Sequence, residues 1–354
     1  MATYGYAHGC SGLRSRVAVN TITGDLMAVE IIEGFDTFSI SQMTRRYPNS
    51  IQGSSGAMST GRYSVGQALA LNNGNAHCDI PVTARSEYYV GFDAQLTTVT
   101  STDPFFKFTT SGGSTIGSIG AAAGGVVTST WGNSASGVIT AATWFNVQMH
   151  IVISASVGVF VLKVDGNTVI NLSSLNTGST NVGFEVLQGS NVGYLFDNVW
   201  SFNTTGSHSN GFPVGTMTVQ TLYPTADGTY TDFTPNSGSN HYSRVNEAVC
   251  NDDTSYVYAT NVNSKDSYTI GSLSGAISQV HGVQVSAAYE KDDTPAKTMR
   301  VFCKSSSTTS ETSDLAVPAA YTSSTLVLND DPNTSAQWTT TNVNALEVGV
   351  KVIA

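Results

Sequence analysis

Charged side chains are scarce in this chain of 354 residues. Only 11% are Asp, Glu, Lys or Arg, and 15 basic against 25 acidic residues leave a formal net charge of −10. Neutralising the phosphates of nucleic acid or of an anionic membrane requires clustered lysine and arginine. The densest basic spots are two pairs, Arg14 with Arg16 and Arg45 with Arg46. The composition therefore argues against nucleic acid as a partner.

Long apolar runs and a secretory leader are also missing. No stretch approaches the ~18 apolar residues of a membrane span. The first residues, MATYGYAHGCSGLRSR, show no basic segment followed by an apolar one. These absences predict a protein that is made in a cytoplasm and has no membrane span.

Cysteine is rare. The four cysteines, Cys10, Cys78, Cys250 and Cys303, include no Cys-x-x-Cys pair of the kind used for zinc or redox work. Buried, reduced thiols are the default in a cytoplasm. A disulfide between Cys250 and Cys303 is an alternative that the sequence leaves open.

Strong helix formers are sparse, whereas 44 Ser, 44 Thr and 34 Gly supply the residues of pleated strands and tight turns. Hydrophobic residues make up 40% of the chain, which is enough to bury real cores. The composition therefore predicts a folded, all-β protein.

Alternating apolar and polar residues mark several strands in the first part of the chain. The segment from Trp144 to Leu172 alternates with period two and turns at Asp165-Gly166, a strong hairpin signal because the tight turn needs positive φ. Further strands are expected at residues 87–96, 104–109, 182–187 and 194–202. Strands at this spacing, without helical patterns between them, predict an antiparallel sandwich.

A second series of strands follows a polar, glycine-rich stretch, NTTGSHSNGFPVG. Strands are expected at residues 230–233, 255–259, 267–270, 280–289, 298–304, 321–328 and 345–353, with one short helical turn near 342–346. The fold class predicted is all-β, with two antiparallel β-sandwich (jelly-roll) domains in tandem. The expected divisions are an N-terminal arm at 1–30, a first sandwich at 31–205, a linker at 206–220 and a second sandwich at 221–354.

The first half resembles the concanavalin A-like, laminin-G-type jelly roll. The stretches TWFNVQMHIVIS, VGVFVLKVDGNTVINL and GYLFDNVWSF carry this resemblance. It implies a jelly-roll fold more securely than a function, because this fold hosts many functions.

The second half is similar to a sandwich found in structural proteins of tailed bacteriophages, on the stretches VHGVQVSAAYEKDD, MRVFCKS and AQWTTTNVNALEVGVKV. This resemblance implies a virion protein that is made in the host cytoplasm and assembles as a homo-oligomer with other virion proteins. Its first residues would then form an arm that docks on a neighbouring subunit.

The acids that catalysis on a concanavalin-type fold requires are not found. Glycosidases of this type carry alternating acids on one strand, so that acid and nucleophile face each other across a cleft. Here Asp93, Glu185 and Asp197 each stand without an acidic partner at that spacing. The protein is therefore expected not to be an enzyme.

Paired acids suggest calcium as the candidate cation. Asp252 with Asp253, and Asp330 with Asp331, lie in Asn- and Asp-rich stretches that could supply oxygen ligands. Turn formation explains the same residues more simply, because the spaced order of a dedicated calcium loop is missing. Asp197 resembles a position near the metal site of some jelly-roll relatives, but a hydrogen bond at a strand end is the favoured interpretation.

Aromatic rings are the candidates for ligand or partner contact. Trp131, Tyr88 and Tyr194 could stack on the apolar face of a sugar. Trp131, within the glycine- and serine-rich STWGNSASG, is the strongest of the three because loops rather than cores carry function.

The function expected from the sequence is that of a non-enzymatic bacteriophage virion structural protein on the particle surface. The first alternative is a carbohydrate-binding adhesin that recognises a host-surface glycan. The second alternative is a polysaccharide-degrading enzyme.

Overall fold

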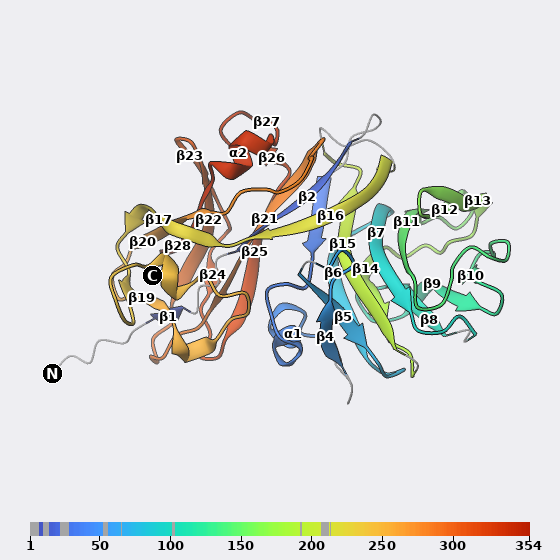
Figure 1. The fold of residues 1–354 in the computed structure, drawn as a ribbon, viewed down its shortest axis with the longest axis horizontal. Coiled ribbons are helices and arrows are strands. Elements are labelled where there is room, and N and C mark those ends of the chain that lie inside the picture. Colours follow the sequence, from blue (N-terminus) through green and yellow to red (C-terminus); the bar gives the residue numbers. More distant parts are fainter. Residues whose placement is uncertain are drawn as a thin grey trace. The chain divides into compact units, whose positions relative to one another are not determined.

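The chain forms two compact β-sheet units (Figure 1). The computed structural model describes residues 7–9, 14–21, 28–51, 56–64, 66–100, 103–191, 193–206, 212 and 214–354. One unit, here the N-terminal sandwich, takes its described residues from 20–35 and 39–218, and the other, the C-terminal sandwich, from 1–19, 36–38 and 219–354. The all-β, antiparallel fold class is confirmed.

The N-terminal sandwich consists of two antiparallel sheets. One has the strand order β10-β9-β8-β14-β6, and the other β13-β12-β11-β7-β15-β5-β4 with β3 paired to β15. The strands are β3 (Ala28–Glu33), β4 (Ala57–Thr60), β5 (Gln67–Leu71), β6 (His77–Arg85), β7 (Glu87–Leu96), β8 (Pro104–Thr109), β9 (Thr115–Ala122), β10 (Val126–Ser129), β11 (Trp144–Val152), β12 (Gly158–Val164), β13 (Asn167–Leu175), β14 (Val182–Gln188) and β15 (Tyr194–Asn203).

Phenylalanine side chains fill the space between these two sheets. Phe92 of β7 stacks on Phe106 of β8, with ring centroids 5.2 Å apart, and meets Phe105 and Phe196 edge to face. All four rings are fully buried. Because successive side chains of a strand point to opposite faces, Asp93 points away from this core.

The hairpin predicted at Asp165-Gly166 is confirmed. These two residues connect β12 to β13 with φ of 46° and 79°, and Val164 pairs with Asn167 across the turn. Two successive positive φ values are the geometry that lets a two-residue loop follow the right-handed twist of the strands.

The C-terminal sandwich contains a four-stranded sheet, β16-β2-β21-β25, and a six-stranded sheet, β17-β20-β28-β22-β23 with β24 paired to β22. Two small sheets, β1-β19-β18 and β26-β27, complete it. The strands are β1 (Ala7–Gly9), β2 (Arg14–Thr21), β16 (Val214–Leu222), β17 (Pro224–Thr231), β18 (Thr234–Pro235), β19 (Val257–Ala259), β20 (Lys265–Ile270), β21 (Val280–Tyr289), β22 (Thr298–Ser305), β23 (Thr308–Glu311), β24 (Leu315–Ala316), β25 (Thr322–Leu328), β26 (Asp330–Asp331), β27 (Ala336–Gln337) and β28 (Glu347–Val352).

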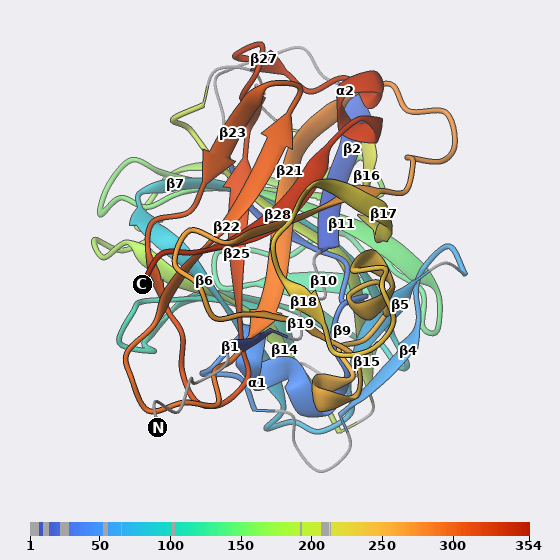
Figure 2. The ribbon, with the colours of Figure 1, turned by 90° about the vertical axis from the view of Figure 1, so that its left-hand side faces the viewer.

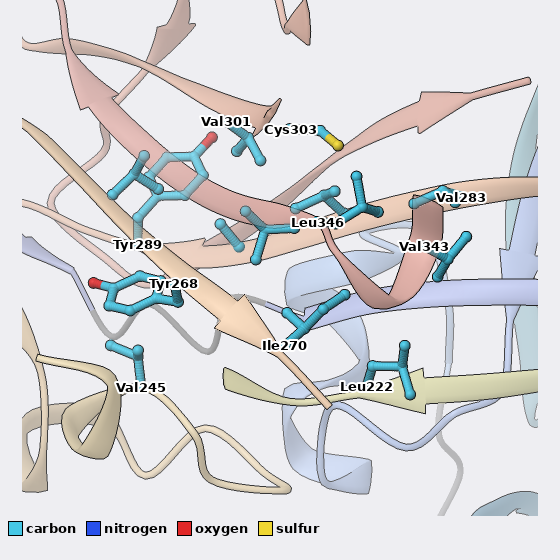
Figure 3. Packing of buried hydrophobic residues seen from close by; sticks show 14 of the residues in the cluster. Leu222, Val245, Tyr268, Ile270, Val283, Tyr289, Val301, Cys303, Val343 and Leu346 are labelled. Atoms are coloured by element: carbon cyan, nitrogen blue, oxygen red, sulfur yellow. The ribbon is translucent and has the colours of Figure 1, made fainter. Parts of the chain in front are cut away.

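An aliphatic core with a few large rings holds the C-terminal sandwich together. Tyr268 of β20, Val283 of β21, Val301 of β22 and Leu346, which directly precedes β28, are fully buried in one cluster (Figure 3). Trp338 closes its edge and donates its indole N–H to the carbonyl of Leu328 at 3.2 Å. Burial of apolar area at roughly 25 cal/mol per Å² makes such a cluster the main stabilising contribution of the unit.

The described strands of the expected N-terminal arm belong to the C-terminal sandwich. β1 pairs with β19, and β2 pairs with β21 from Arg14 opposite Ser286 to Val19 opposite Val280. Figure 2 shows the blue strand β2 among the orange and red strands of the C-terminal half. The division at 1–30, 31–205, 206–220 and 221–354 is therefore too simple, since strands β2 and β16 complete the sheet of residues far along the chain.

Helices are short in the described part of the chain. α1 (Met43–Arg46) and α2 (Thr340–Asn344) are the α-helices, and 3-10 turns lie at Ile40–Gln42, Tyr242–Arg244 and Asp252–Thr254. α2 confirms the helical turn expected near residues 342–346. No helix among the described residues is long and apolar enough to cross a membrane.

The thiols of Cys78 and Cys303 are free and buried, as expected, whereas Cys250 is disulfide-bonded, so the expectation of reduced thiols is wrong for Cys250. The alternative of a Cys250–Cys303 disulfide is therefore wrong. Burial raises the pKa of the Cys303 thiol to about 12, so this group is held in its unreactive, protonated form.

Candidate functional site

A cluster of polar side chains lies on the face of the larger N-terminal sheet that points away from the core. We call it the Arg62 cluster; its members are Arg62, Asp93, Asn146, Asp165, Asp197 and Asn198. Three of its strands, β11, β7 and β15, are neighbours in this sheet (Figure 1). The residues are far apart in sequence, and only the sheet brings them together.

Asp93 is the centre of the Arg62 cluster. Its Oδ1 atom accepts hydrogen bonds from Arg62 Nη1 at 2.5 Å and from Asn146 Nδ2 at 2.8 Å, and its Oδ2 atom accepts one from Asn198 Nδ2 at 2.9 Å. The side chain has no exposed area, and desolvation by this burial raises the pKa of the carboxyl against the opposing effect of Arg62. A buried carboxylate with one arginine and two amide donors fixes all three donors in place.

A local irregularity in β15 places Asn198 within reach of Asp93. The register with β7 shifts between Asp197 and Trp200, and Asn198 has φ of 51°. Asparagine tolerates this left-handed conformation better than most residues, so a polar residue here permits the bulge. Asp197 Oδ2 in turn accepts the backbone N–H of Arg62 at 2.8 Å, which fixes the loop between β4 and β5.

The solvent-facing part of this cluster combines a ring, a cation and a carboxylate. Tyr63 as a whole residue is 50% exposed, and the guanidinium of Arg62 lies over its ring, 5.4 Å from the centroid. The Asp165 side chain is 49% exposed, with Oδ1 accepting the backbone N–H of Asn146 at 2.8 Å. Arg62 Nη2 lies 3.7 Å from the same oxygen, too far for a hydrogen bond, so this end of the guanidinium is available to donate elsewhere.

The sequence alone did not predict this cluster. Asp93, Asp165 and Asp197 were each interpreted separately, as an isolated acid, a hairpin residue and a strand-end residue. The signal that would have connected them is Arg62, a rare basic residue followed by an aromatic one in a short glycine-bounded loop, GRYSVG.

Two of the three predicted contact rings do not fit that role. Tyr88 and Tyr194 have no exposed area. The Tyr88 hydroxyl donates to the carbonyl of Thr83 and accepts the backbone N–H of Arg85 at 2.6 Å. Buried rings cannot stack on an external sugar, so the expectation for these two residues was wrong; both point into the core because they alternate in phase with its aromatic residues.

Trp131 lies on the loop after β10, as expected, but its ring is partly covered. The ring centroid is 4.7 Å from that of Phe160, and a side chain at Gly117 would collide with the indole. The ring is thus half-buried against the sheet, and contact with a partner stays a prediction for its exposed part.

The paired acids make local hydrogen bonds. Asp331 is buried and accepts bonds from the backbone N–H of Asn333 at 3.0 Å and from Asn342 Nδ2 at 2.6 Å, which hold a turn. Asp253 accepts the Tyr321 hydroxyl at 2.9 Å, and Asp252 begins a 3-10 turn with φ of 55°. In the described part of the chain no three His, Cys, Asp or Glu side chains are grouped as a metal site would require. Calcium binding at Asp252, Asp253, Asp330 and Asp331 stays a prediction.

Another acid lies inside the N-terminal sandwich. Glu185 of β14 points between the sheets, where its Oε1 atom accepts the hydroxyl of Ser201 of β15 at 2.7 Å. Its Oε2 atom is buried without a hydrogen-bond partner. Desolvation raises the pKa of this carboxyl to about 8, with the negative charge of Glu30 adding to the effect. Glu185 is closed off from solvent and therefore cannot act on an external substrate.

Comparisons with known proteins identify no family for this chain and only distant structural similarity. No protein-family model and no curated protein matches the chain. Among solved structures, domain 4 of AbnA, a GH43 extracellular arabinanase from Geobacillus stearothermophilus in complex with arabinotriose, is 12% identical over 52% of this chain and 96% of that domain, with a TM-score of 0.33. A mutant of HCR/D is 10% identical over 85% of this chain and 93% of that one, with a TM-score of 0.31. At these TM-scores the likeness carries no argument about function.

Proposed function

We propose that the N-terminal sandwich binds glycan at the Arg62 cluster, with Tyr63 as the platform for a sugar ring. The observation that carries this proposal is the half-exposed Tyr63 beside Arg62 and Asp165, two charged groups of opposite sign. An aromatic face receives the apolar C–H face of a sugar, and flanking polar groups select its hydroxyls. Of the three functions considered from the sequence, the carbohydrate-binding alternative is the one that this geometry supports.

The chemistry of a sugar diol matches the exposed atoms of this cluster. A hydroxyl both donates and accepts, so one hydroxyl donates to the carboxylate of Asp165 while its neighbour accepts from Arg62 Nη2. The hydrogen bond to Asp93 holds Arg62 in place before any ligand arrives. Preorganisation of this kind lowers the entropic cost of binding.

A glycan array on the full chain, followed by calorimetric titration of the best ligand, tests the proposal. Replacing the aromatic platform in Tyr63→Ala should weaken binding at least tenfold, equivalent to about 1.4 kcal/mol. The exposed position of the residue predicts an unchanged melting temperature.

Two control variants separate stacking from other effects. Tyr63→Phe keeps the ring and should bind nearly as well as the parent protein. Val157→Ala removes an apolar side chain that is 69% exposed on the same sandwich and should change nothing. The absence of any bound glycan on the array, or an affinity of Tyr63→Ala equal to that of the parent protein, would contradict the proposal.

We expect no turnover of the bound glycan. Among the described residues of this sandwich three acids have a raised pKa: Asp93 and Glu185 have no exposed area, and Asp79, whose side chain is 19% exposed, lies on β6 outside the Arg62 cluster. General acid catalysis requires an acid within hydrogen-bond reach of the substrate. Release of reducing sugar from any bound polysaccharide would support the enzyme alternative instead.

A bacteriophage virion role is our second proposal, and it is compatible with glycan binding, because a surface decoration can also adhere. It rests on the resemblance of the C-terminal half to phage structural proteins. The closing sequence of that resemblance has a clear structural task, since Trp338, α2 and β28 close one edge of the C-terminal core. Mass spectrometry of purified particles would detect the protein if it is part of a virion.

A further inference from the structure

A groove lies at one end of the smaller sheet of the N-terminal sandwich. The adjacent strands β8, β14 and β6 contribute Pro104 and Lys107, Gln188, and His77 respectively. Ile51 extends the sheet beyond β6, because its backbone exchanges hydrogen bonds of 2.9 and 2.7 Å with that of His77. We call this the His77 groove; none of its residues belongs to the Arg62 cluster.

Hydrogen bonds fix the floor of the His77 groove. The Gln188 amide donates to the carbonyl of Gly74 at 2.7 Å and accepts from Lys107 Nζ at 3.0 Å. Gly189 beside it packs so closely that a Cβ atom would lie 2.5 Å from the carbonyl oxygen of Asn73. The Ser190 hydroxyl bonds to Asp103 at 3.3 Å. These contacts therefore fix the positions of the residues that line the His77 groove.

The lining mixes hydrogen-bonding groups with a small apolar surface. Lys107 supplies donors and Asp103 supplies acceptors. The His77 side chain is 22% exposed; its Nδ1 atom donates to the carbonyl of Asn75 at 3.0 Å, and its Nε2 atom lies 3.7 Å from Asp79 Oδ1. Ile51 is 52% exposed at the edge, a rare position for isoleucine. A ligand that fits must therefore offer hydroxyls together with an apolar face.

We propose that the His77 groove is a second saccharide site, for one neutral sugar unit. Charges of both signs line it, which disfavours a ligand of high charge of either sign. The C–H face of a sugar would pack on Ile51 and Pro104, and its hydroxyls would bond to Lys107 and Asp103. The choice of a sugar rather than another polyol rests on the proposed glycan binding of the same sandwich.

Two sites on one sandwich change the expected binding of long glycans. A chain that reaches both sites binds the second one intramolecularly, which raises overall affinity without any new contact. A single sugar unit, by contrast, fills each site independently. Stoichiometry with a short ligand therefore counts the sites.

The test is calorimetric titration of the full chain with a neutral trisaccharide chosen from the array. Parent protein should bind two molecules, and Tyr63→Ala and Lys107→Met one each, while the double variant binds none. Lys107→Met keeps the length of the side chain but removes the donor. Because this change also deletes the bond to Gln188, the Ile51 methyl signal is followed by NMR in the parent protein, where ligand should shift it, and in Tyr63→Ala, where it should shift equally.

The variants distinguish the two proposals. One site in the parent protein, removed by Tyr63→Ala, together with an unmoved Ile51 signal, overturns the groove and leaves the Arg62 cluster standing. One site that Lys107→Met removes and Tyr63→Ala does not supports the groove and overturns the platform at Tyr63. Absence of all saccharide binding overturns both.

Discussion

The carboxylate of Glu185, when it is ionised, destabilises the N-terminal sandwich because it is buried. Its Oε2 atom lacks a partner, and the pKa of the carboxyl in the fold is about 8, above its ordinary value of 4.5. The fold therefore binds a proton that the unfolded chain releases between these two pH values. Stability is highest at low pH on this account, falls as pH rises from about 4.5 to 8, and stays constant above.

Replacing this carboxyl by its neutral isostere should remove the cost. Glu185→Gln is expected to raise the free energy of unfolding at pH 8.5 by up to ~5 kcal/mol, and the melting temperature with it. Near pH 4 both should be unchanged. Thermal unfolding followed by circular dichroism at both pH values measures this. Ser201→Ala removes the hydroxyl that bonds to Glu185 and should steepen the loss of stability with pH. Equal pH dependence in Glu185→Gln and the parent protein would show that Glu185 does not titrate as inferred.

At the level of secondary structure, β2 is the element whose place matters most. It has β16 on one side and β21 on the other, so β2 is an interior strand of this sheet. Val17 lies opposite Val283, near the middle of β21. β2 therefore completes the sheet that covers one side of the C-terminal core.

A proline in β2 should destabilise the C-terminal sandwich. Val17→Pro deletes one backbone donor in a central strand and leaves an acceptor unpaired, so we expect a loss of about 2–4 kcal/mol. Val17→Thr keeps the β-branch and the N–H and serves as the control. Hydrogen exchange along residues 280–289 reports the effect directly. Unchanged exchange there in Val17→Pro would mean that β2 does not hold the place in solution that the structure gives it.

Local patterns explain which elements the sequence predicted. β7, β8 and β21 coincide with the strands expected at 87–96, 104–109 and 280–289, and the Asp165-Gly166 hairpin was read from two residues. The partner of β2, in contrast, is a strand more than 250 residues along the chain, and no local pattern specifies such a pairing. The sequence did not show that Tyr88 and Tyr194 are buried, because period-two alternation does not say which face of a sheet is covered.

The Arg62 cluster could not be predicted from the sequence, because it too depends on which strands are neighbours in the sheet. Asp93, Asn146 and Asn198 converge only because β11, β7 and β15 are adjacent, and Arg62 reaches them from a separate loop. Each residue alone has an ordinary explanation as a turn or strand-end residue. The sheet order turns four ordinary residues into one hydrogen-bonded cluster.

At the scale of the whole molecule, the two sandwiches differ in self-sufficiency. All hydrogen-bonded strand neighbours of β3 to β15 lie within residues 28–206. The C-terminal sandwich draws β1 and β2 from the start of the chain and β16 from residues 214–222. Apart from residues 36–38, which belong to the other unit, the N-terminal sandwich is continuous in sequence, and the C-terminal sandwich is not.

Two fragments test this asymmetry. Residues 28–206 should unfold cooperatively and run as a folded species in size-exclusion chromatography. Residues 221–354, which lack β1, β2 and nearly all of β16, should aggregate or lack a cooperative transition, because β21 then keeps β25 as its only sheet neighbour. A stable, cooperatively unfolding 221–354 fragment would show that the early strands are dispensable.

The chain contributes β1 and β2 to the C-terminal sandwich, then builds the N-terminal sandwich, and returns at β16 before finishing in β28. β2 and β28 belong to the two different sheets of this sandwich, so a pull applied between them is resisted by the strand pairing within each sheet and by the packing of the two sheets. The N-terminal sandwich lies in the part of the chain between β2 and β16 and carries no tension until those contacts break. We therefore expect the proposed glycan-binding surface, which lies in this part of the chain, to keep its shape when the protein is pulled.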